Sequence, residues 1–209
     1  MRSEVSTTYY AKFTLISRKE EAHKIFSETF SFEPNTMRGL RPGRFLMVWL
    51  PGIDEFPLSP SDYDVGKRVV KLTFKVRGAG TAALSELSVG NSVFARGPYG
   101  NGFTIPRDLH HRSDEDEPVL VAGGGVGVAP LLPLIKDLVG KGFNLYVVLG
   151  FRSAADSFFV DEVSKLVGDN FAVSTDTGEL GVRGTVVDAV NSILRQRYKR
   201  FSYVYACGP

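Results

Sequence analysis

The second half of the sequence, from Pro118 onward, alternates short apolar segments with segments of helical periodicity. The apolar segments are PVLVAGG, NLYVVLGF, NFAVSTDT and FSYVYACG, and the helical ones are APLLPLIKDLVGKG, SFFVDEVSKLVG and TVVDAVNSILRQRY. Strands separated by helices of this length pair in parallel through right-handed crossovers. The pattern therefore predicts an α/β domain with a parallel sheet over residues 118–209.

The first half, residues 1–107, has a different pattern. It contains short alternating or apolar runs bounded by glycine and proline, and one helical segment: YYAKFTLIS, RFLMVWLPG, VVKLTFKV and the helical GTAALSEL. Short strands at near-regular spacing are typical of an antiparallel barrel or sandwich. The polar stretch RDLHHRSDEDE follows, so residues 108–117 are predicted to form a linker. We interpret His110 and His111 within it as solvated side chains and not as metal ligands.

Composition excludes several classes of protein. The 209 residues include 25 Lys and Arg against 23 Asp and Glu, a balance that does not suit a nucleic-acid-binding surface. The longest apolar stretch, PVLVAGGGVGVAPLLPLI, is broken by glycine and proline and is a poor membrane span. Cys207 is the single cysteine, so the chain alone cannot hold an iron–sulfur cluster. We expect a cytoplasmic protein that binds neither nucleic acid nor a membrane.

A glycine-rich loop, with Gly123, Gly124, Gly125 and Gly127, joins the first predicted parallel strand to its helix. Glycines let a ligand approach the backbone, and amides at a helix start favour anions, so the loop is predicted to bind a dinucleotide diphosphate. The spacing is not the common G-x-G-x-x-G. The alternative is a tight turn without a ligand, but four glycines exceed what a turn needs.

The segment GGVGVAP, residues 124–130, resembles the nicotinamide-domain signature of ferredoxin–NAD(P)+ reductase-like flavoproteins. The resemblance covers essentially the whole chain. It implies a six-stranded antiparallel Greek-key β-barrel that binds FAD, followed by an α/β domain that binds the nicotinamide nucleotide. It also implies that Cys207, in the terminal Cys-Gly-Pro, lies beside the nicotinamide ring. Considered alone, a free cysteine is more often a small buried strand residue.

Three stretches of the first half resemble flavin contacts of the same family. The first, FPLS, implies FAD contacts at Pro57, Leu58 and Ser59, with the Ser59 hydroxyl near the reactive ring nitrogen. Phe56 stands where the family has an arginine that meets a flavin phosphate. The residues that could replace that cation are Lys71, Lys75 and Arg77.

The second stretch, KVRGAGT, resembles the segment that holds the FAD diphosphate, with Thr81 expected to open and cap a short helix. The implied cofactor-binding residues are Lys75, Val76, Gly78, Gly80 and Thr81. The third stretch, GPYGNGF, resembles the loop that closes the barrel next to the flavin.

These stretches and the Asp54–Glu55 pair narrow the resemblance to the electron-transfer subunits of heteromeric dihydroorotate dehydrogenase, which act in pyrimidine biosynthesis. In that family FAD and a [2Fe-2S] cluster relay electrons between NAD+ and the FMN of a partner catalytic subunit. The cluster cysteines follow Cys-Gly-Pro in a C-terminal extension. We expect the cluster only in such an extension, no metal site in this chain, and a sequence that is part of a longer protein. The alternative is a shortened homologue without a cluster.

The resemblance implies that Ser59 and Cys207 are the catalytic residues. Arg152, directly after the second parallel strand, would lie where the adenine ribose is read, and the choice between NAD and NADP stays open, with the resemblance favouring NAD. Two other functions remain: an NAD(P)H:ferredoxin or sulfide-type reductase subunit with a different partner, and a nucleotide-binding regulatory module without redox chemistry.

Overall fold

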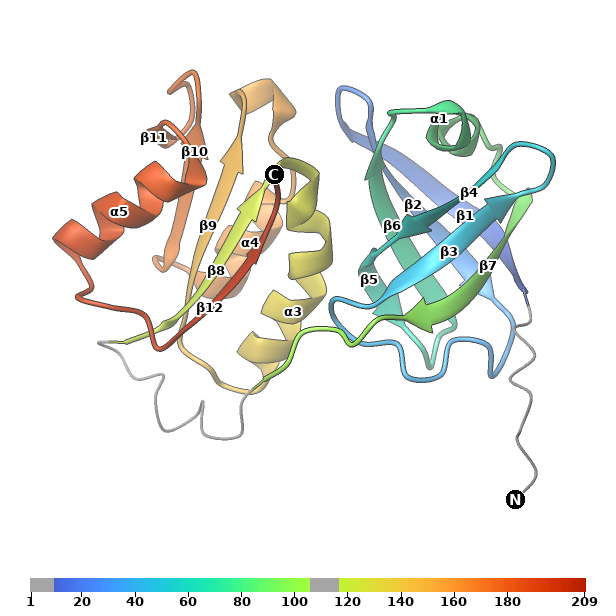
Figure 1. Ribbon diagram of the computed structural model, residues 1–209, viewed down its shortest axis with the longest axis horizontal. Helices are drawn as coiled ribbons and strands as arrows, with labels where there is room; N and C mark the ends of the chain where they lie inside the picture. Colours follow the sequence, from blue (N-terminus) through green and yellow to red (C-terminus); the bar gives the residue numbers. More distant parts are fainter. Residues whose placement is uncertain (1–9, 106–116) are drawn as a thin grey trace.

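The structure, a computed structural model, describes residues 10–105 and 117–209. Most of the predicted linker, with His110 and His111, lies outside the described residues. The limits predicted for the two domains stay predictions. The structure does contain an antiparallel and a parallel sheet, in that order along the chain (Figure 1).

The antiparallel sheet is formed by the first part of the chain. Its elements are β1 (Ala11–Ala22), β2 (Ile25–Phe32), β3 (Phe45–Leu50), β4 (Asp54–Leu58), β5 (Pro60–Asp64), β6 (Val69–Lys75), α1 (Ala79–Ser85) and β7 (Ser92–Tyr99). The strand order is β4-β3-β7-β1-β2-β6-β5. Because β7 returns to lie between β3 and β1, the connectivity is of the Greek-key type.

The sheet closes into a barrel at Ser59. This residue alone separates β4 from β5, which are the two outermost strands of the order. The segment 54–64 therefore pairs with β3 through its first half and with β6 through its second half. Counting this broken strand once gives the six-stranded barrel that the resemblance implies.

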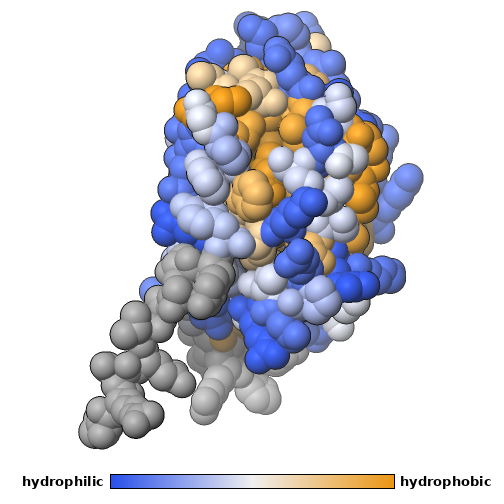
Figure 2. All heavy atoms as spheres, turned by 90° about the vertical axis from the view of Figure 1, so that its right-hand side faces the viewer, coloured by the Kyte–Doolittle hydropathy of each residue, from blue (hydrophilic) through white to orange (hydrophobic). Residues whose placement is uncertain are grey.

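Alternation of side chains explains the barrel core. Strand residues point alternately to the two faces of a sheet, so one face of each strand fills the interior. The largest side chains there, Phe13, Phe30 and Phe74, are almost fully buried, and Leu84 from α1 joins them. The remaining outer surface is partly apolar: Ile16, Ile53 and Val89 are exposed, and Figure 2 shows hydrophobic surface on this end of the molecule.

The parallel sheet is formed by the second part of the chain. Its elements are β8 (Val119–Gly124), η1 (Gly125–Gly127), α3 (Val128–Gly140), β9 (Leu145–Phe151), η2 (Ala154–Asp156), α4 (Val160–Val167), β10 (Phe171–Thr175), β11 (Val182–Arg183), α5 (Val186–Gln196) and β12 (Tyr203–Cys207). All pairings are parallel, in the order β11-β10-β9-β8-β12.

Helices cover both faces of the parallel sheet. On one face Val121, Val147 and Leu149 pack against α3 and α4. On the other face Val148 packs with Ala189 of α5. Burial on both faces explains why these strands are almost continuously apolar. The predicted α/β architecture is confirmed, and the two-residue β11 is an addition that the sequence pattern did not predict.

The two sheets are held together through α3 and β12. Helix α3 lies between the parallel sheet and the barrel and packs on β5 (Figure 1). Lys136 of α3 places its Nζ 2.8 Å from Asp62 of β5 and 2.8 Å from Glu162 of α4. The Tyr205 hydroxyl donates a hydrogen bond of 2.8 Å to the carbonyl oxygen of Thr104. No helix within residues 10–105 and 117–209 is long and apolar enough to cross a membrane.

Candidate functional site

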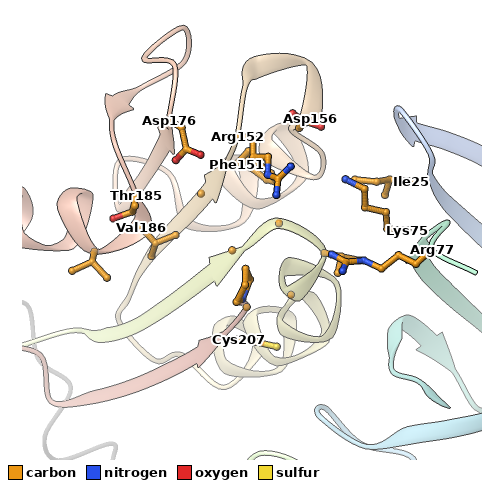
Figure 3. Close-up of a pocket in the computed structure, with 18 residues that line it drawn as sticks. Ile25, Lys75, Arg77, Phe151, Arg152, Asp156, Asp176, Thr185, Val186 and Cys207 are labelled. Atoms are coloured by element: carbon orange, nitrogen blue, oxygen red, sulfur yellow. The ribbon is translucent and has the colours of Figure 1, made fainter. Parts of the chain in front are cut away.

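A cavity of about 770 Å³ lies where the carboxyl ends of the parallel strands face the barrel (Figure 3). On the side of the parallel sheet, the wall is made by the glycine-rich loop, the ends of β9 and β12, Asp176 after β10, and the start of α5. The barrel contributes Ile25, Lys75 and Arg77. The volume is in the range of small-molecule sites, and the carboxyl edge of a parallel sheet is where such sheets bind ligands.

The four predicted loop glycines have two different roles. Gly123 and Gly127 are required by packing: a Cβ on Gly123 would lie 3.0 Å from Cγ2 of Val128, and one on Gly127 only 2.6 Å from the carbonyl oxygen of Cys207. Gly124, Gly125 and Gly127 line the cavity, and Gly125 has φ +52° with no atom within 4 Å of the point where a Cβ would lie. Packing thus explains Gly123 and Gly127, whereas Gly124 and Gly125 have no such close packing and expose their backbone to the cavity.

Cys207 ends β12 and lines the same cavity. Its side chain is half-buried and packs against the apolar cluster formed by α3, α4 and the sheet. Burial raises the pKa of the Cys207 thiol, so the thiol is protonated at neutral pH. The contact between Gly127 and the Cys207 carbonyl joins the glycine-rich loop directly to the strand end that carries the thiol.

Charged side chains line the cavity from both sides. Lys75 and Arg77 come from the barrel, and Arg152 follows β9 as predicted (Figure 3). Within the described part of the chain, no side-chain hydrogen bond or ion pair engages any of these three cations. Among the acidic residues, Asp156 accepts a hydrogen bond of 2.7 Å from the Ser153 hydroxyl.

Sequence reasoning missed several residues of this wall: Ile25, Asp156, Asp176, Thr185, Val186 and Val187. A positional signal was present for two of them. Asp176 directly follows β10, and Thr185 caps α5, accepting a hydrogen bond from the Asp188 amide. Both therefore lie at the carboxyl edge of the predicted sheet, where ligand-binding residues gather.

The residues predicted to contact flavin form a second group, on the barrel. Pro57 and Leu58 are in β4, and Ser59 is at the break between β4 and β5. Helix α1 contacts β4, which brings these residues near Gly78, Gly80 and Thr81. Lys75 and Val76 lie at the end of β6, and Leu58 and Val76 pack against the barrel core. Of this group only Lys75 also lines the cavity.

The expectation for Thr81 was wrong in detail. Helix α1 begins at Ala79 after the N-cap Gly78, so Thr81 is its third residue and not its cap. The Thr81 hydroxyl oxygen instead accepts hydrogen bonds from the backbone amides of Arg77, at 2.9 Å, and Gly78, at 3.1 Å. The side chain therefore fixes the turn between β6 and α1 from inside the helix.

Gly80 also has a packing reason that the sequence did not reveal. A Cβ at Gly80 would lie 2.5 Å from Cε1 of Phe56 and 2.7 Å from a carboxyl oxygen of Asp54. By contrast, no atom lies within 4 Å of a Cβ built on Gly78. Gly80 lets α1 approach β4, and Gly78 is the glycine that leaves open space for a ligand.

Comparison with solved structures defines the class. The chain aligns with an NADH-dependent reduced ferredoxin–NADP oxidoreductase at a TM-score of 0.79 and 29% identity, covering 94% of this chain and 67% of that one. It aligns with phthalate dioxygenase reductase at a TM-score of 0.73 and 19% identity, covering 96% and 60%. With its barrel, its parallel sheet and the cavity between them, the chain has the two-domain FAD- and NAD-binding fold of ferredoxin reductase-type flavoproteins.

Curated relatives narrow the class. The dihydroorotate dehydrogenase B (NAD(+)), electron transfer subunits of Listeria welshimeri and Streptococcus pneumoniae are each 34% identical to the chain, which covers 73% and 72% of their lengths with 93% of its own. A probable subunit from Methanocella arvoryzae is 36% identical, over 87% of this chain and 63% of that protein. No protein-family model matches the chain. The chain belongs to the family of dihydroorotate dehydrogenase B electron transfer subunits, a family name that implies a catalytic partner subunit.

Proposed function

We propose that the chain transfers electrons between NAD(H) and a redox partner through FAD, as the electron transfer subunit of a dihydroorotate dehydrogenase in pyrimidine biosynthesis. The observation that supports this most is the cavity at the carboxyl edge of the parallel sheet, walled by the glycine-rich loop and by the barrel that would carry the flavin. The relatives' names supply the reaction. The partner in this proposal is an FMN-containing catalytic subunit.

The residues of the barrel fit FAD. Gly78 leaves open space beside the turn between β6 and α1, and Lys75 offers a cation without a partner among the described residues. Pro57, Leu58 and Ser59 would contact the ring, and Val76, Gly78, Gly80 and Thr81 would surround the diphosphate. FAD would supply the exchange between hydride transfer and single-electron transfer.

The residues of the cavity fit a nicotinamide dinucleotide. Gly124 and Gly125 expose backbone to the cavity, so their segment of the loop would bind the diphosphate. Arg152 would lie near the adenine ribose, and Cys207 would pack beside the nicotinamide ring. Because its thiol is protonated, Cys207 would position the ring and not act as a charged group. NAD is the proposed nucleotide, in line with the relatives' names, with NADP as the alternative.

The [2Fe-2S] cluster of the proposed pathway would be held outside the present sequence. A cluster of this kind takes four cysteine ligands, or two cysteines and two histidines, and this sequence has one cysteine. Within residues 10–105 and 117–209, no three His, Cys, Asp or Glu side chains are grouped to hold a metal ion. The single free thiol also suits the reducing cytoplasm in which we propose that the protein works.

Co-purification tests the proposal. The chain should purify with FAD at about one per chain, and NADH should reduce that flavin under anaerobic conditions. Co-expression with an FMN-containing dihydroorotate dehydrogenase subunit should give a complex that reduces NAD+ with dihydroorotate, whereas the catalytic subunit alone should not. Absence of flavin would refute the redox function, and a flavoprotein that does not associate with this partner would refute the assignment to dihydroorotate oxidation.

A second function is favoured by one observation. The structural match at 29% identity is to an NADH-dependent ferredoxin–NADP oxidoreductase, so a reductase subunit for ferredoxin or a sulfide-type partner is the alternative. Rapid reduction of ferredoxin by NADH through the isolated chain, without activity on dihydroorotate in any complex, would support that alternative.

A further inference from the structure

The cavity brings together positive charges from both sheets. Lys75 and Arg77 belong to the end of β6 and the turn after it, and Arg152 follows β9. Their side chains form no ion pair or hydrogen bond with other residues in the described ranges. Asp156 and Asp176 also line the cavity, so its lining carries three positive and two negative side chains, and Asp156 accepts a hydrogen bond from Ser153. Each cation without a partner attracts an anion, so the cavity suits a ligand that carries negative charge.

The position of Arg77 indicates which ligand it meets. The flavin-contact candidates Ser59, Gly78 and Thr81 do not line the cavity, although Arg77 directly precedes Gly78 in the chain. The arginine side chain instead extends from the barrel towards the nucleotide domain (Figure 3). Apart from Ile25, Lys75 and Arg77, every lining residue comes from residues 117–209. Arg77 thus faces the nucleotide cavity and not the flavin contacts.

We propose that Arg77 binds the diphosphate of the nicotinamide dinucleotide from the barrel side, opposite Gly124 and Gly125 of the glycine-rich loop. The inference rests on the proposed function for the identity of the nucleotide. A guanidinium donates two parallel hydrogen bonds to phosphate oxygens, which backbone amides on the opposite wall leave available. Lys75, on the same wall, adds a second positive charge.

A consequence is that the dinucleotide bridges the two sheets. The loop that holds one side of the diphosphate belongs to the parallel sheet, and the cation on the other side belongs to the barrel. Loss of Arg77 should therefore lower the affinity for the dinucleotide without releasing flavin.

The test uses the full chain saturated with FAD and two probes, ADP-ribose and adenosine, titrated by calorimetry. ADP-ribose carries the diphosphate and lacks the nicotinamide, so its binding is independent of redox activity. The variant is Arg77→Gln, which keeps most of the side-chain length and removes the charge. Lys12→Gln is the control, because Lys12 is an exposed cation of the barrel strand β1 that does not line the cavity.

We expect Arg77→Gln to weaken ADP-ribose binding about tenfold, with adenosine binding and flavin content unchanged, and Lys12→Gln to leave all three unchanged. Unchanged ADP-ribose affinity in Arg77→Gln, or no ADP-ribose binding by the wild-type protein, would overturn the proposal. Loss of FAD from Arg77→Gln would also overturn it and would move Arg77 to the flavin site. Failure of the proposed function is seen separately, as a wild-type chain whose flavin is absent or not reduced by NADH.

Discussion

Glu28 is the most unusual charged residue of the barrel, and it yields a quantitative prediction. It is fully buried, and neither carboxyl oxygen has a hydrogen-bond partner in the described structure. In the sheet it lies opposite Leu72 of β6, whose side chain is in the barrel core, and opposite Arg18 of β1. The Arg18 guanidinium donates hydrogen bonds to the carbonyl oxygens of Ser85 and Leu87 and not to Glu28.

Burial raises the pKa of Glu28 from the ordinary 4.5 to about 8, and the charge of Arg18 offsets only part of this effect. The folded state therefore binds a proton more tightly than the unfolded state, so stability falls as the pH rises from about 4.5 through about 8. At about 1.4 kcal/mol per pKa unit, the free energy of unfolding should drop by roughly 3 kcal/mol between pH 5 and pH 8 because of this one residue.

Glu28→Gln tests the reasoning, because the amide has the same shape and does not titrate. The free energy of unfolding should be measured with urea on FAD-saturated protein at several pH values from 5 to 8.5. Relative to the wild type, the free energy of unfolding of the variant should rise with pH by roughly 3 kcal/mol over this range. Glu86→Gln, at an exposed carboxylate, is the control and should show no such gain. A stability difference between Glu28→Gln and wild type that stays constant with pH would refute the buried-carboxyl argument.

Four further substitutions test the candidate site. Gly125→Val places a side chain in the open part of the cavity, so NADH should reduce the flavin at least tenfold more slowly with an unchanged flavin spectrum; equal rates by stopped flow would return the loop to a structural role. Gly78→Val should lower FAD occupancy with little loss of thermal stability, whereas Gly80→Val should lower thermal stability because the new side chain would clash with Phe56. Full FAD occupancy in Gly78→Val would argue against a flavin site at this turn. The Cys207 thiol should be labelled faster as the pH rises towards its raised pKa, and more slowly when NAD+ is bound. Cys207→Ala should slow hydride transfer more than it lowers the free energy of unfolding. If the labelling rate does not change when NAD+ is added, the thiol belongs to the core and not to the site.

The sequence predicted the parallel sheet more completely than the barrel, for a physical reason. Strands buried on both faces, such as β8 and β9, are continuously apolar and are visible in the pattern. Strand β2 was missed, because it reads IFSETFSF and carries Glu28 on its inward face. The barrel was recognised through its resemblance to flavoproteins, and the closure at Ser59 depends on partners in β3 and β6 that no local pattern contains.

The glycines are the residues whose roles the sequence alone distinguishes least. A ligand-binding glycine and a packing glycine look identical in a sequence, because the difference lies in which atoms approach from elsewhere in the chain. Phe56 and Asp54 leave no room for a side chain at Gly80, and the backbone of Cys207 and Gly208 leaves none at Gly127. Among the six glycines predicted to bind cofactors, an added Cβ would lie 3.0 Å or less from another atom at Gly80, Gly123 and Gly127. Gly78, Gly124 and Gly125 have no neighbour that close.

The glycine-rich loop packs on the chain's last strand, and this packing couples the two predicted nucleotide contacts, the loop with the diphosphate and Cys207 with the nicotinamide. A Cβ on Gly127 would meet the carbonyl of Cys207, and a Cβ on Gly208 would lie 2.9 Å from the amide nitrogen of Gly124. The loop proposed to hold the diphosphate and the thiol proposed to pack on the nicotinamide therefore cannot move independently. In the proposed complex the dinucleotide spans both, so this backbone contact would set the distance between the diphosphate site and the nicotinamide site. Substitutions at Gly127 would displace both contacts together. An added Cβ at Gly125 meets no atom within 4 Å, so substitution there strains the loop's own backbone at φ +52° but leaves the contact with Cys207 in place. Gly125 is therefore the position that separates diphosphate binding from the placement of Cys207.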